Sequence, residues 1–201
     1  MNAEEIMSCE EFKKCEAFHG HVCPGLSLGY RASKAGMERL RENRSEDEEI
    51  VAIVETDACC ADAVQVMTGC TFGKGNFIYK DYGKVAFTFL SRNSGKGVRI
   101  AIRDGAMQMS DEHRGLIQKV VQDTVSSEER ERFDTLHFRK SCEILETPLE
   151  SLFTITSVNP PLPKKAKIEP SVLCDRCGEP TMGSKLEESG EQRVCRGCLD
   201  S

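Results

Sequence analysis

Two Cys-x-x-Cys pairs near the carboxyl end of the chain constrain its fold more than any other feature. Cys174 and Cys177 form the first pair and Cys195 and Cys198 the second, with seventeen residues between the pairs. Zinc prefers four soft ligands in a tetrahedron, and each pair presents two thiolates. The spacing therefore predicts a structural zinc site with no free coordination position, whose metal supplies much of the folding free energy of this segment. Two unrelated pairs or a disulfide-linked tail are the alternatives.

Composition excludes several classes of function. The chain has 201 residues, a net charge of -6, 39% hydrophobic and 30% charged residues, which is typical of a soluble globular protein. Seven basic and seven acidic residues follow from Lys164 onward, so we do not expect nucleic-acid binding. No run approaches the ~18 apolar residues of a membrane span, and the amino-terminal segment does not resemble a secretory signal. We expect a cytoplasmic protein with reduced thiols.

A proline-rich stretch separates the paired cysteines from the rest of the chain. The sequence "NPPLPKKAKIEP" has four prolines in twelve residues, which is typical of an extended linker. We therefore predict a core domain over residues 1–158, a Pro/Lys-rich linker over 159–170 and a zinc finger over 171–201.

The core domain mixes helical and strand patterns. Apolar residues recur with helical spacing in some segments and alternate in others. Ser126 and Glu129 form a capping-box signature at a helix start. The pattern predicts an α+β domain with a mixed sheet. The expected elements are a helix over 26–44, a strand over 49–56, a helix over 59–69, strands joined by a hairpin over 92–97, helices within 110–146 and a strand over 151–158.

Histidine and cysteine residues gather where two helices are expected to begin. Pro24 suits the first position of a helix, which makes Cys23 the N-cap and places its sulfur where the helix dipole favours thiolate. Cys59 follows a strand and lies near the next helix start. His19 and His21 point the same way if the chain between them is extended. These residues form a pocket if the fold joins the two helix starts. Capped helices with cysteines buried as small apolar groups are the alternative.

Other polar candidates carry weaker signals. Lys74, in the glycine-rich "TGCTFGKGNF", is a candidate for binding an anion or cofactor phosphate, although a turn between helix and strand explains most of this segment. His113 and His137 lie in predicted helices, and we expect them to be surface or core residues and not metal ligands.

Two long motifs resemble a known family. "FHGHVCPGLSLGYRA", "ETDACCADAVQVMTGCTFGKGNFIYKDYGKVAFTF" and the terminal Cys-x-x-Cys pairs are similar to the family of the E-type subunit of formylmethanofuran dehydrogenase. The resemblance implies an α+β core, with a mixed sheet of about five strands flanked by helices, whose active site can hold zinc. It also implies a treble-clef-type zinc finger at the carboxyl end.

The resemblance also implies which residues form the core site. Cys60 stands where a small residue is expected, so the sulfur of either Cys59 or Cys60 is the candidate ligand. The implied metal ligands are His19, His21, Cys23 and Cys59, of which Cys59, Cys23 and His21 are also the candidate catalytic residues. The remaining motif positions fall on Gly20, Pro24, Asp62, Gln65, Thr68, Gly69, Cys70 and Thr71.

Three functions remain open at this point. The resemblance favours a metal-binding accessory protein of one-carbon and molybdenum- or tungsten-enzyme metabolism, with a zinc ion in the core and another in the finger. It implies a homodimer and, as partners, subunits of a formylmethanofuran dehydrogenase. The alternative is an independent zinc- or thiol-dependent enzyme that uses Cys23 and Cys59. A zinc-finger regulator that binds nucleic acid is the least favoured.

Overall fold

The computed structural model describes residues 2–200, and they divide into two compact units. The first unit extends to Lys165 and the second begins at Ala166. The boundary falls within residues 159–170, which contain no helix or strand.

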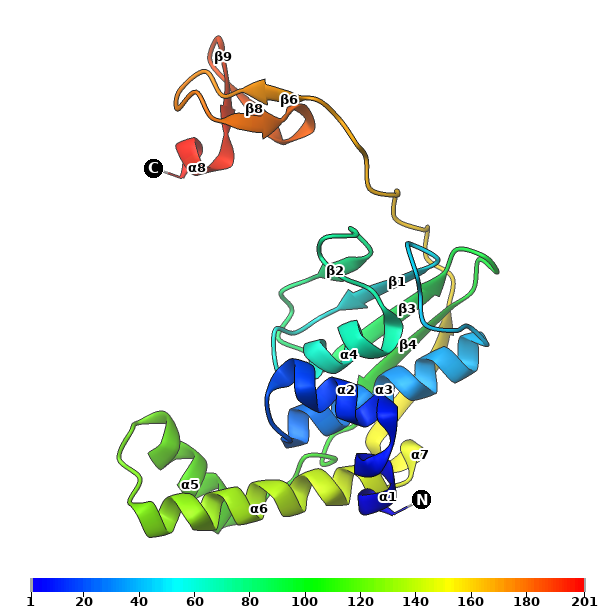
Figure 1. The fold of residues 1–201 in the computed structure, drawn as a ribbon, viewed down its shortest axis with the longest axis vertical. Helices are drawn as coiled ribbons and strands as arrows, with labels where there is room; N and C mark the ends of the chain where they lie inside the picture. The colour runs from blue at the N-terminus through cyan, green and yellow to red at the C-terminus, as the bar shows by residue number, and fades with distance from the viewer. Residues whose placement is uncertain (1, 201) are drawn as a thin grey trace. The chain divides into compact units, whose positions relative to one another are not determined.

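The first unit is built on a mixed five-stranded sheet (Figure 1). β1 pairs in parallel with β2, and the other neighbours are antiparallel, so the strand order is β2-β1-β3-β4-β5. The tight connection between β3 and β4 is the predicted hairpin. The predicted α+β fold with a mixed sheet is confirmed. The strands are β1 (Ile50–Val54), β2 (Phe77–Tyr79), β3 (Ala86–Ser91), β4 (Gly97–Ile102) and β5 (Phe153–Val158).

Two helices pack closely against each other, and glycines on one of them, α3, form the contact face. α3 (Pro24–Leu40) packs on the sheet and against α4 (Cys60–Thr68). A Cβ atom added to Gly36 would lie 2.3 Å from the Phe89 ring, and one on Gly29 would lie 2.3 Å from the Cys60 carbonyl oxygen. Only glycine permits so close an approach at these positions, so these two residues determine how near α3 comes to its neighbours.

Two further helices precede α3, and the sequence patterns did not predict them. α1 (Ala3–Ser8) and α2 (Glu10–His19) are short and charged. The Asn2 side chain caps α1, and the Cys9 sulfur accepts a hydrogen bond from the amide of Phe12 at the start of α2. Phe12 is fully buried and packs edge-on against Tyr30 of α3, which fixes α2 beside α3.

A helical hairpin and a short helix complete the first unit. α5 (Asp111–Val121) and α6 (Ser127–Glu146) pack against each other, and the predicted capping box at Ser126 and Glu129 is confirmed. α6 also packs on α1 and α3. α7 (Leu149–Leu152) leads directly into β5, so the strand predicted over 151–158 begins two residues later than expected.

The second unit is small and has almost no apolar core. Among residues 166–200, Cys174 and Val194 alone are buried. Two strand pairs and a terminal helical turn bring the four cysteines together. The elements are β6 (Ser171–Leu173), β7 (Pro180–Met182), the 3-10 turn η1 (Gly183–Lys185), β8 (Leu186–Ser189), β9 (Gln192–Cys195) and α8 (Arg196–Leu199).

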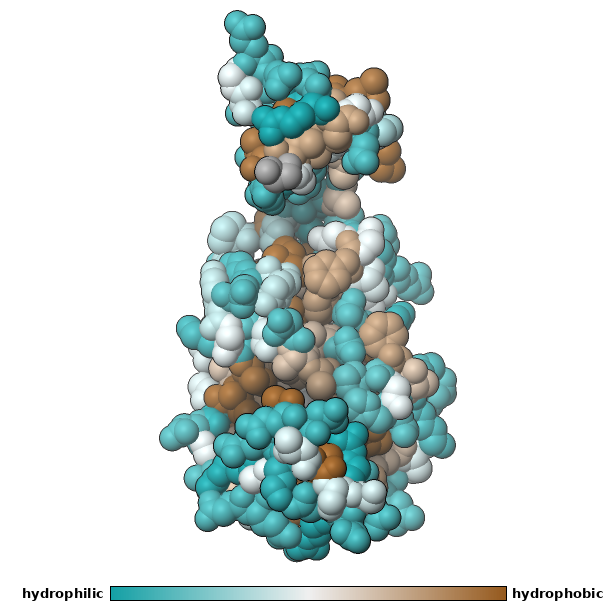
Figure 2. All heavy atoms as spheres, turned by 90° about the vertical axis from the view of Figure 1, so that its left-hand side faces the viewer, coloured by the Kyte–Doolittle hydropathy of each residue, from teal (hydrophilic) through white to brown (hydrophobic). Residues whose placement is uncertain are grey.

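The surface is mixed in character. On the face shown in Figure 2, apolar residues stand in small groups among polar ones. None of the helices within residues 2–200 combines the length and the apolar character that crossing a bilayer requires.

Candidate functional site

The starts of α3 and α4 meet, as the core site requires. Cys23 is the N-cap of α3, with Pro24 following it, and its sulfur accepts a hydrogen bond from the Leu26 amide at 3.3 Å. Cys59 is the N-cap of α4. A Cβ atom on Gly25 would lie 2.9 Å from the Cys59 Cβ, so a glycine lets the two helix starts touch. Two helix dipoles therefore direct their positive ends toward the same place.

The two histidines of the first motif lie together because the chain turns, and not because it is extended. His19 is the last residue of α2, and Gly20 ends that helix with a φ of 95°, a left-handed conformation that favours glycine. The ring centroids of His19 and His21 lie 4.6 Å apart. The extended chain that would make the two side chains point the same way is therefore not present, although the imidazoles are neighbours.

The orientation of the His19 ring is set by a carboxylate on α4. Its Nδ1 lies 2.7 Å from the Asp62 carboxylate, and its Nε2 lies 3.6 Å from the Cys23 sulfur. A carboxylate on one ring nitrogen leaves the other free to bind a metal, which is the usual arrangement around zinc-bound histidine. Bond lengths of zinc to nitrogen and sulfur place two such ligands about 3.5 Å apart in a tetrahedron. The separation of Nε2 and sulfur fits that value.

Three ligand atoms form a compact cluster here. One atom each of His19, His21 and Cys23 lies within 4.8 Å of the others. Cys59 lies beside Cys23 but outside this cluster. The side chain of Cys60 is buried in the apolar core that α3 and α4 form with the sheet, and this burial raises its pKa to about 12. Of the two adjacent cysteines, Cys59 is therefore the one that faces the cluster.

The free Cys23 thiol is held neutral, contrary to the expectation from its position at a helix start. Burial, opposed by the Leu26 amide and aided by the Cys59 thiol, raises the pKa of Cys23 to about 11. Desolvation outweighs the helix dipole because the side chain is almost completely buried. A metal ion would have to displace this proton, so metal binding here depends on pH.

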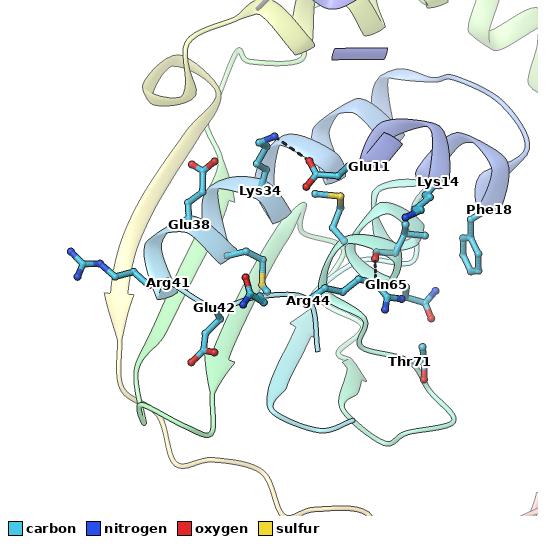
Figure 3. A pocket seen from close by; sticks show the side chains of 14 residues that line it. Glu11, Lys14, Phe18, Lys34, Glu38, Arg41, Glu42, Arg44, Gln65 and Thr71 are labelled. Atoms are coloured by element: carbon cyan, nitrogen blue, oxygen red, sulfur yellow. Dashed lines mark hydrogen bonds and ion pairs between the residues drawn. The ribbon is translucent and has the colours of Figure 1, made fainter. Parts of the chain in front are cut away.

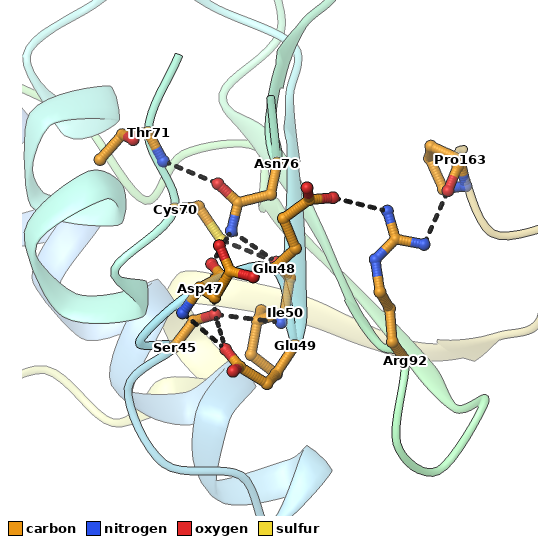
Figure 4. A network of polar contacts seen from close by, with 10 residues as sticks. All are labelled: Ser45, Asp47, Glu48, Glu49, Ile50, Cys70, Thr71, Asn76, Arg92 and Pro163. Carbon is orange, nitrogen blue, oxygen red and sulfur yellow. Dashed lines mark hydrogen bonds and ion pairs between the residues drawn. The ribbon is translucent and has the colours of Figure 1, made fainter. Parts of the chain in front are cut away.

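The Thr-Gly-Cys-Thr segment and Lys74 lie at the other end of the parallel strands. Cys59 follows β1, whereas Lys74 precedes β2. Because the two strands are parallel, these residues lie at opposite ends of the strands. The Lys74 ammonium donates a hydrogen bond to the Glu46 carbonyl. The Cys70 sulfur contacts the Ile50 carbonyl in a network around Asn76 (Figure 4). These contacts stabilise the loop that precedes β2, so the role of this segment is structural.

The second ligand cluster is the set of four paired cysteines. The Cys174 and Cys198 sulfurs lie 4.0 Å apart, and those of Cys177 and Cys195 lie 3.9 Å apart. Zinc–thiolate bonds of about 2.3 Å place the sulfurs of a tetrahedral site ~3.8 Å apart, so the cluster fits zinc. The order of turn, hairpin and terminal helix is consistent with a small zinc finger.

The finger sulfurs lie in an environment that suits a cation. Backbone amides of Cys177 and Cys195 lower the pKa of Cys174 to about 6, whereas the neighbouring thiols raise the pKa of Cys198 to about 12. Four sulfurs this close repel one another as thiolates, and a divalent ion removes that repulsion.

The remaining two histidines also form a pair, which sequence reasoning missed. His113 near the start of α5 and His137 within α6 approach to 3.1 Å between Nε2 and Nδ1. Helical patterns placed both residues in helices but did not show that the helices would face each other. We expected surface or core residues here; His113 is a core residue, 3% exposed, and His137 is half-buried.

An open cleft lies elsewhere on the packed unit, and the sequence did not indicate it, although two of its lining residues, Gln65 and Thr71, belong to the family motif. It has a volume of about 940 Å³ and lies between α2, α3 and α4 (Figure 3). Met37, Val66 and Met67 contribute apolar surface, and Phe18 adjoins His19. Basic and acidic side chains both contribute to its wall, namely Lys14, Lys34, Arg41 and Arg44 with Glu11, Glu38 and Glu42.

Comparison with known proteins identifies the family. The model of a family described as FmdE, molybdenum formylmethanofuran dehydrogenase operon, matches residues 18–154. The chain belongs to this family. The match includes the His/Cys cluster and ends before the four paired cysteines.

Two known proteins are similar to this chain. A tungsten formylmethanofuran dehydrogenase FmdE-like protein from Syntrophus aciditrophicus has a similar structure, with a TM-score of 0.63 and 26% identity, covering 98% of this chain and 91% of that one. A probable S-adenosyl-L-methionine-binding protein from Archaeoglobus fulgidus is 34% identical over 195 residues, covering 94% of this chain. The chain spans about half the length of that relative, 52%.

Proposed function

We propose that this FmdE-family chain binds zinc at the His/Cys cluster through His19, His21 and Cys23, with Cys59 beside them. The observation that carries the proposal is the His19 ring, whose Nδ1 is held by Asp62 while Nε2 faces the Cys23 sulfur. Three protein ligands leave one position of a zinc ion for water or substrate, as in catalytic sites. A zinc ion in such a site lowers the pKa of bound water and polarises carbonyl oxygens.

The role of the chain's own residues follows from their positions. Asp62 orients the His19 ring and raises its basicity. The starts of α3 and α4 supply amide dipoles that favour an anion at the open position. Cys59 would close the site by binding the metal itself, or leave it open by remaining a neighbour.

We infer that the biological setting is one-carbon metabolism with a molybdenum or tungsten enzyme. The family description and the name of the Syntrophus relative support this, since both refer to formylmethanofuran dehydrogenase. The chain would then act in the cytoplasm as an accessory factor, as a homodimer and in contact with subunits of that enzyme. The four-cysteine unit would hold a structural zinc ion and contact protein, because its charges are balanced and do not favour nucleic acid.

Metal replacement tests whether the core site is open. We expect one equivalent of cobalt to fill the core of the metal-free Cys174→Ser/Cys177→Ser variant and to show the near-ultraviolet band of thiolate ligation by Cys23, and we expect this spectrum to shift when azide is added. Anion binding would show a free position. A spectrum that is unchanged at saturating azide would contradict an open site, and the absence of cobalt would contradict the core site altogether.

A thiol-dependent enzyme is the alternative, and it has less support. A reactive cysteine needs a lowered pKa, whereas the pKa of the buried Cys23 is raised to about 11. Alkylation with iodoacetamide near pH 6, followed by mass spectrometry, distinguishes a thiol-dependent enzyme from a zinc site. Rapid modification of Cys23 or Cys59 in the metal-free protein would favour thiol chemistry over the zinc site.

S-adenosyl-L-methionine binding is a second candidate function, which the cleft in Figure 3 supports. Its apolar surface suits an adenine ring, and its mixed charges suit a zwitterion with a sulfonium. The name of the Archaeoglobus relative supports the same ligand. Calorimetric titration of the full chain with S-adenosyl-L-methionine should then show binding that Phe18→Ala weakens, whereas Lys13→Ala, outside the cleft, leaves it unchanged. No heat of binding would contradict it.

A further inference from the structure

The chain has four histidines, and the fold brings them together in two pairs. His19 and His21 are ring neighbours in the core cluster. His113 of α5 and His137 of α6 form the second pair, with 3.1 Å between Nε2 and Nδ1. This pair shares no residue with the core cluster.

The surroundings of the pair hold both rings in place. The Phe133 ring stacks on His137 with centroids 4.7 Å apart and meets His113 edge-on at 5.9 Å. Among residues 2–200, no carboxylate forms an ion pair with either imidazole, and the nearby Glu112 carboxylate is occupied by two hydrogen bonds from Arg132. The His113 Nε2 and His137 Nδ1 atoms therefore face each other without a carboxylate between them.

This arrangement of two imidazoles has two chemical explanations. One ring can donate its N–H to the other, or both can direct lone pairs toward a shared ion. Burial lowers the pKa of both His113 and His137, and the neutral imidazole is the form that binds metals. Zinc–nitrogen bonds of about 2.0–2.1 Å place two ligands of a tetrahedral ion ~3.3 Å apart, close to the observed separation.

We propose that His113 and His137 form a third metal site, which takes a divalent transition-metal ion that prefers imidazole, such as zinc, cobalt or nickel. Such an ion would be held by two protein ligands, so its remaining positions are open to water or to an anion. Two ligands also make this site weaker than the His/Cys cluster or the finger. The buried Lys140, whose ammonium binds Glu143 at 2.8 Å, adds positive charge near the pair and weakens binding of the ion further.

Titration of the full chain tests the proposal. Protein purified with a weak chelator retains its tightly bound ions, which are counted first by plasma mass spectrometry. Addition of zinc, followed by calorimetry, should then show one further equivalent per chain. Cobalt bound at the same step should absorb weakly in the visible range and lack the intense near-ultraviolet band of thiolate ligation, because the pair has no sulfur.

Three variants decide the assignment. His113→Gln and His137→Gln should each abolish the further equivalent and leave the count of tightly bound ions unchanged. The His137→Gln substitution disturbs the fold less than His113→Gln, because His137 is only partly buried. Arg139→Gln on the exposed side of α6 is the matched control. A further equivalent that persists in His137→Gln, or its absence from the parent chain, would overturn the proposal. Neither result bears on the proposed core site, whose ion is counted before titration.

Discussion

The two ligand clusters of this chain are built in opposite ways. In residues 166–200 only two side chains are buried, and four cysteines take the place of an apolar core. The His/Cys cluster lies on a packed domain, where contacts among helices α2, α3 and α4 position its side chains. On the proposed assignments, a bound metal would supply most of the folding free energy of the first cluster, whereas the packed helices would position the ligands of the second.

The largest expected effect is the loss of the finger. Cys174→Ser/Cys177→Ser removes two of four thiolates, and structural zinc contributes on the order of 10 kcal/mol to folding of such units. We expect residues 166–200 to lose all protection from amide hydrogen exchange, while residues 2–165 keep theirs. Hydrogen-exchange mass spectrometry measures both regions at once. Loss of protection throughout the chain would contradict the independence of the two units.

The next effect concerns the glycine contact that positions the core cluster. A Cβ on Gly29 would lie 2.3 Å from backbone of Cys60, so Gly29→Ala must push α3 and α4 apart. We expect a loss of about 1–3 kcal/mol in unfolding free energy by urea titration.

Gly115→Ala in the middle of α5 is the matched control for this substitution. Nothing lies within 4 Å of its added Cβ, so it should stabilise the protein by about 0.5–1 kcal/mol. Equal effects of the two substitutions would show that close helix packing does not matter.

A smaller effect is expected at the residue that orients His19. Asp62→Asn removes the carboxylate 2.7 Å from Nδ1 and should weaken zinc binding at the core about 10–100-fold. Competition with a fluorescent zinc chelator measures this. Asp57→Asn removes the same charge close by in the sequence and should leave the affinity nearly unchanged. If both variants bind alike, Asp62 does not act through His19.

The effect that is smallest for a single thiol and a single pH unit is a pH dependence of the packed unit. Burial raises the pKa of Cys15 to about 12 and that of Cys23 to about 11, from the usual 9.0. Above pH 9 the unfolded chain loses these protons first, so the stability that they contribute is complete below about pH 9 and is lost as pH rises through about 11 to 12.

Urea unfolding of the metal-free protein tests this. The unfolding free energy should fall by about 1 kcal/mol per buried thiol for each pH unit above about 9. Cys15→Ala should flatten the curve. A stability that increases with pH in this range would show that the thiols are not held neutral.

Local rules predicted much of the fold. Pro24 after Cys23, the Ser126 capping box and the hairpin turn between Val85 and Val98 act through neighbouring residues, so the sequence shows them directly. α1 and α2 were missed because they are short and charged, and their apolar contacts, such as Phe12 with Tyr30, come from tertiary packing.

The sites were predictable only where ligands are close in sequence. The Cys-x-x-Cys pairs and the His19–Cys23 segment could be found by spacing. The His113–His137 pair and the cleft depend on which helices face each other, and 24 residues separate the two histidines. The raised pKa of Cys23 was missed for a different reason, since the helix dipole can be seen in sequence but burial cannot.

The metal content of the purified chain tests the central claim most directly. Plasma mass spectrometry on protein prepared without oxygen and dialysed against a weak chelator should find two ions per chain. The Cys174→Ser/Cys177→Ser variant should retain one, held by the His/Cys cluster, and Cys23→Ser/Cys59→Ser should retain the other. One ion in the parent and none in the finger variant would contradict the account, because the packed domain would then hold its ligands without binding a metal.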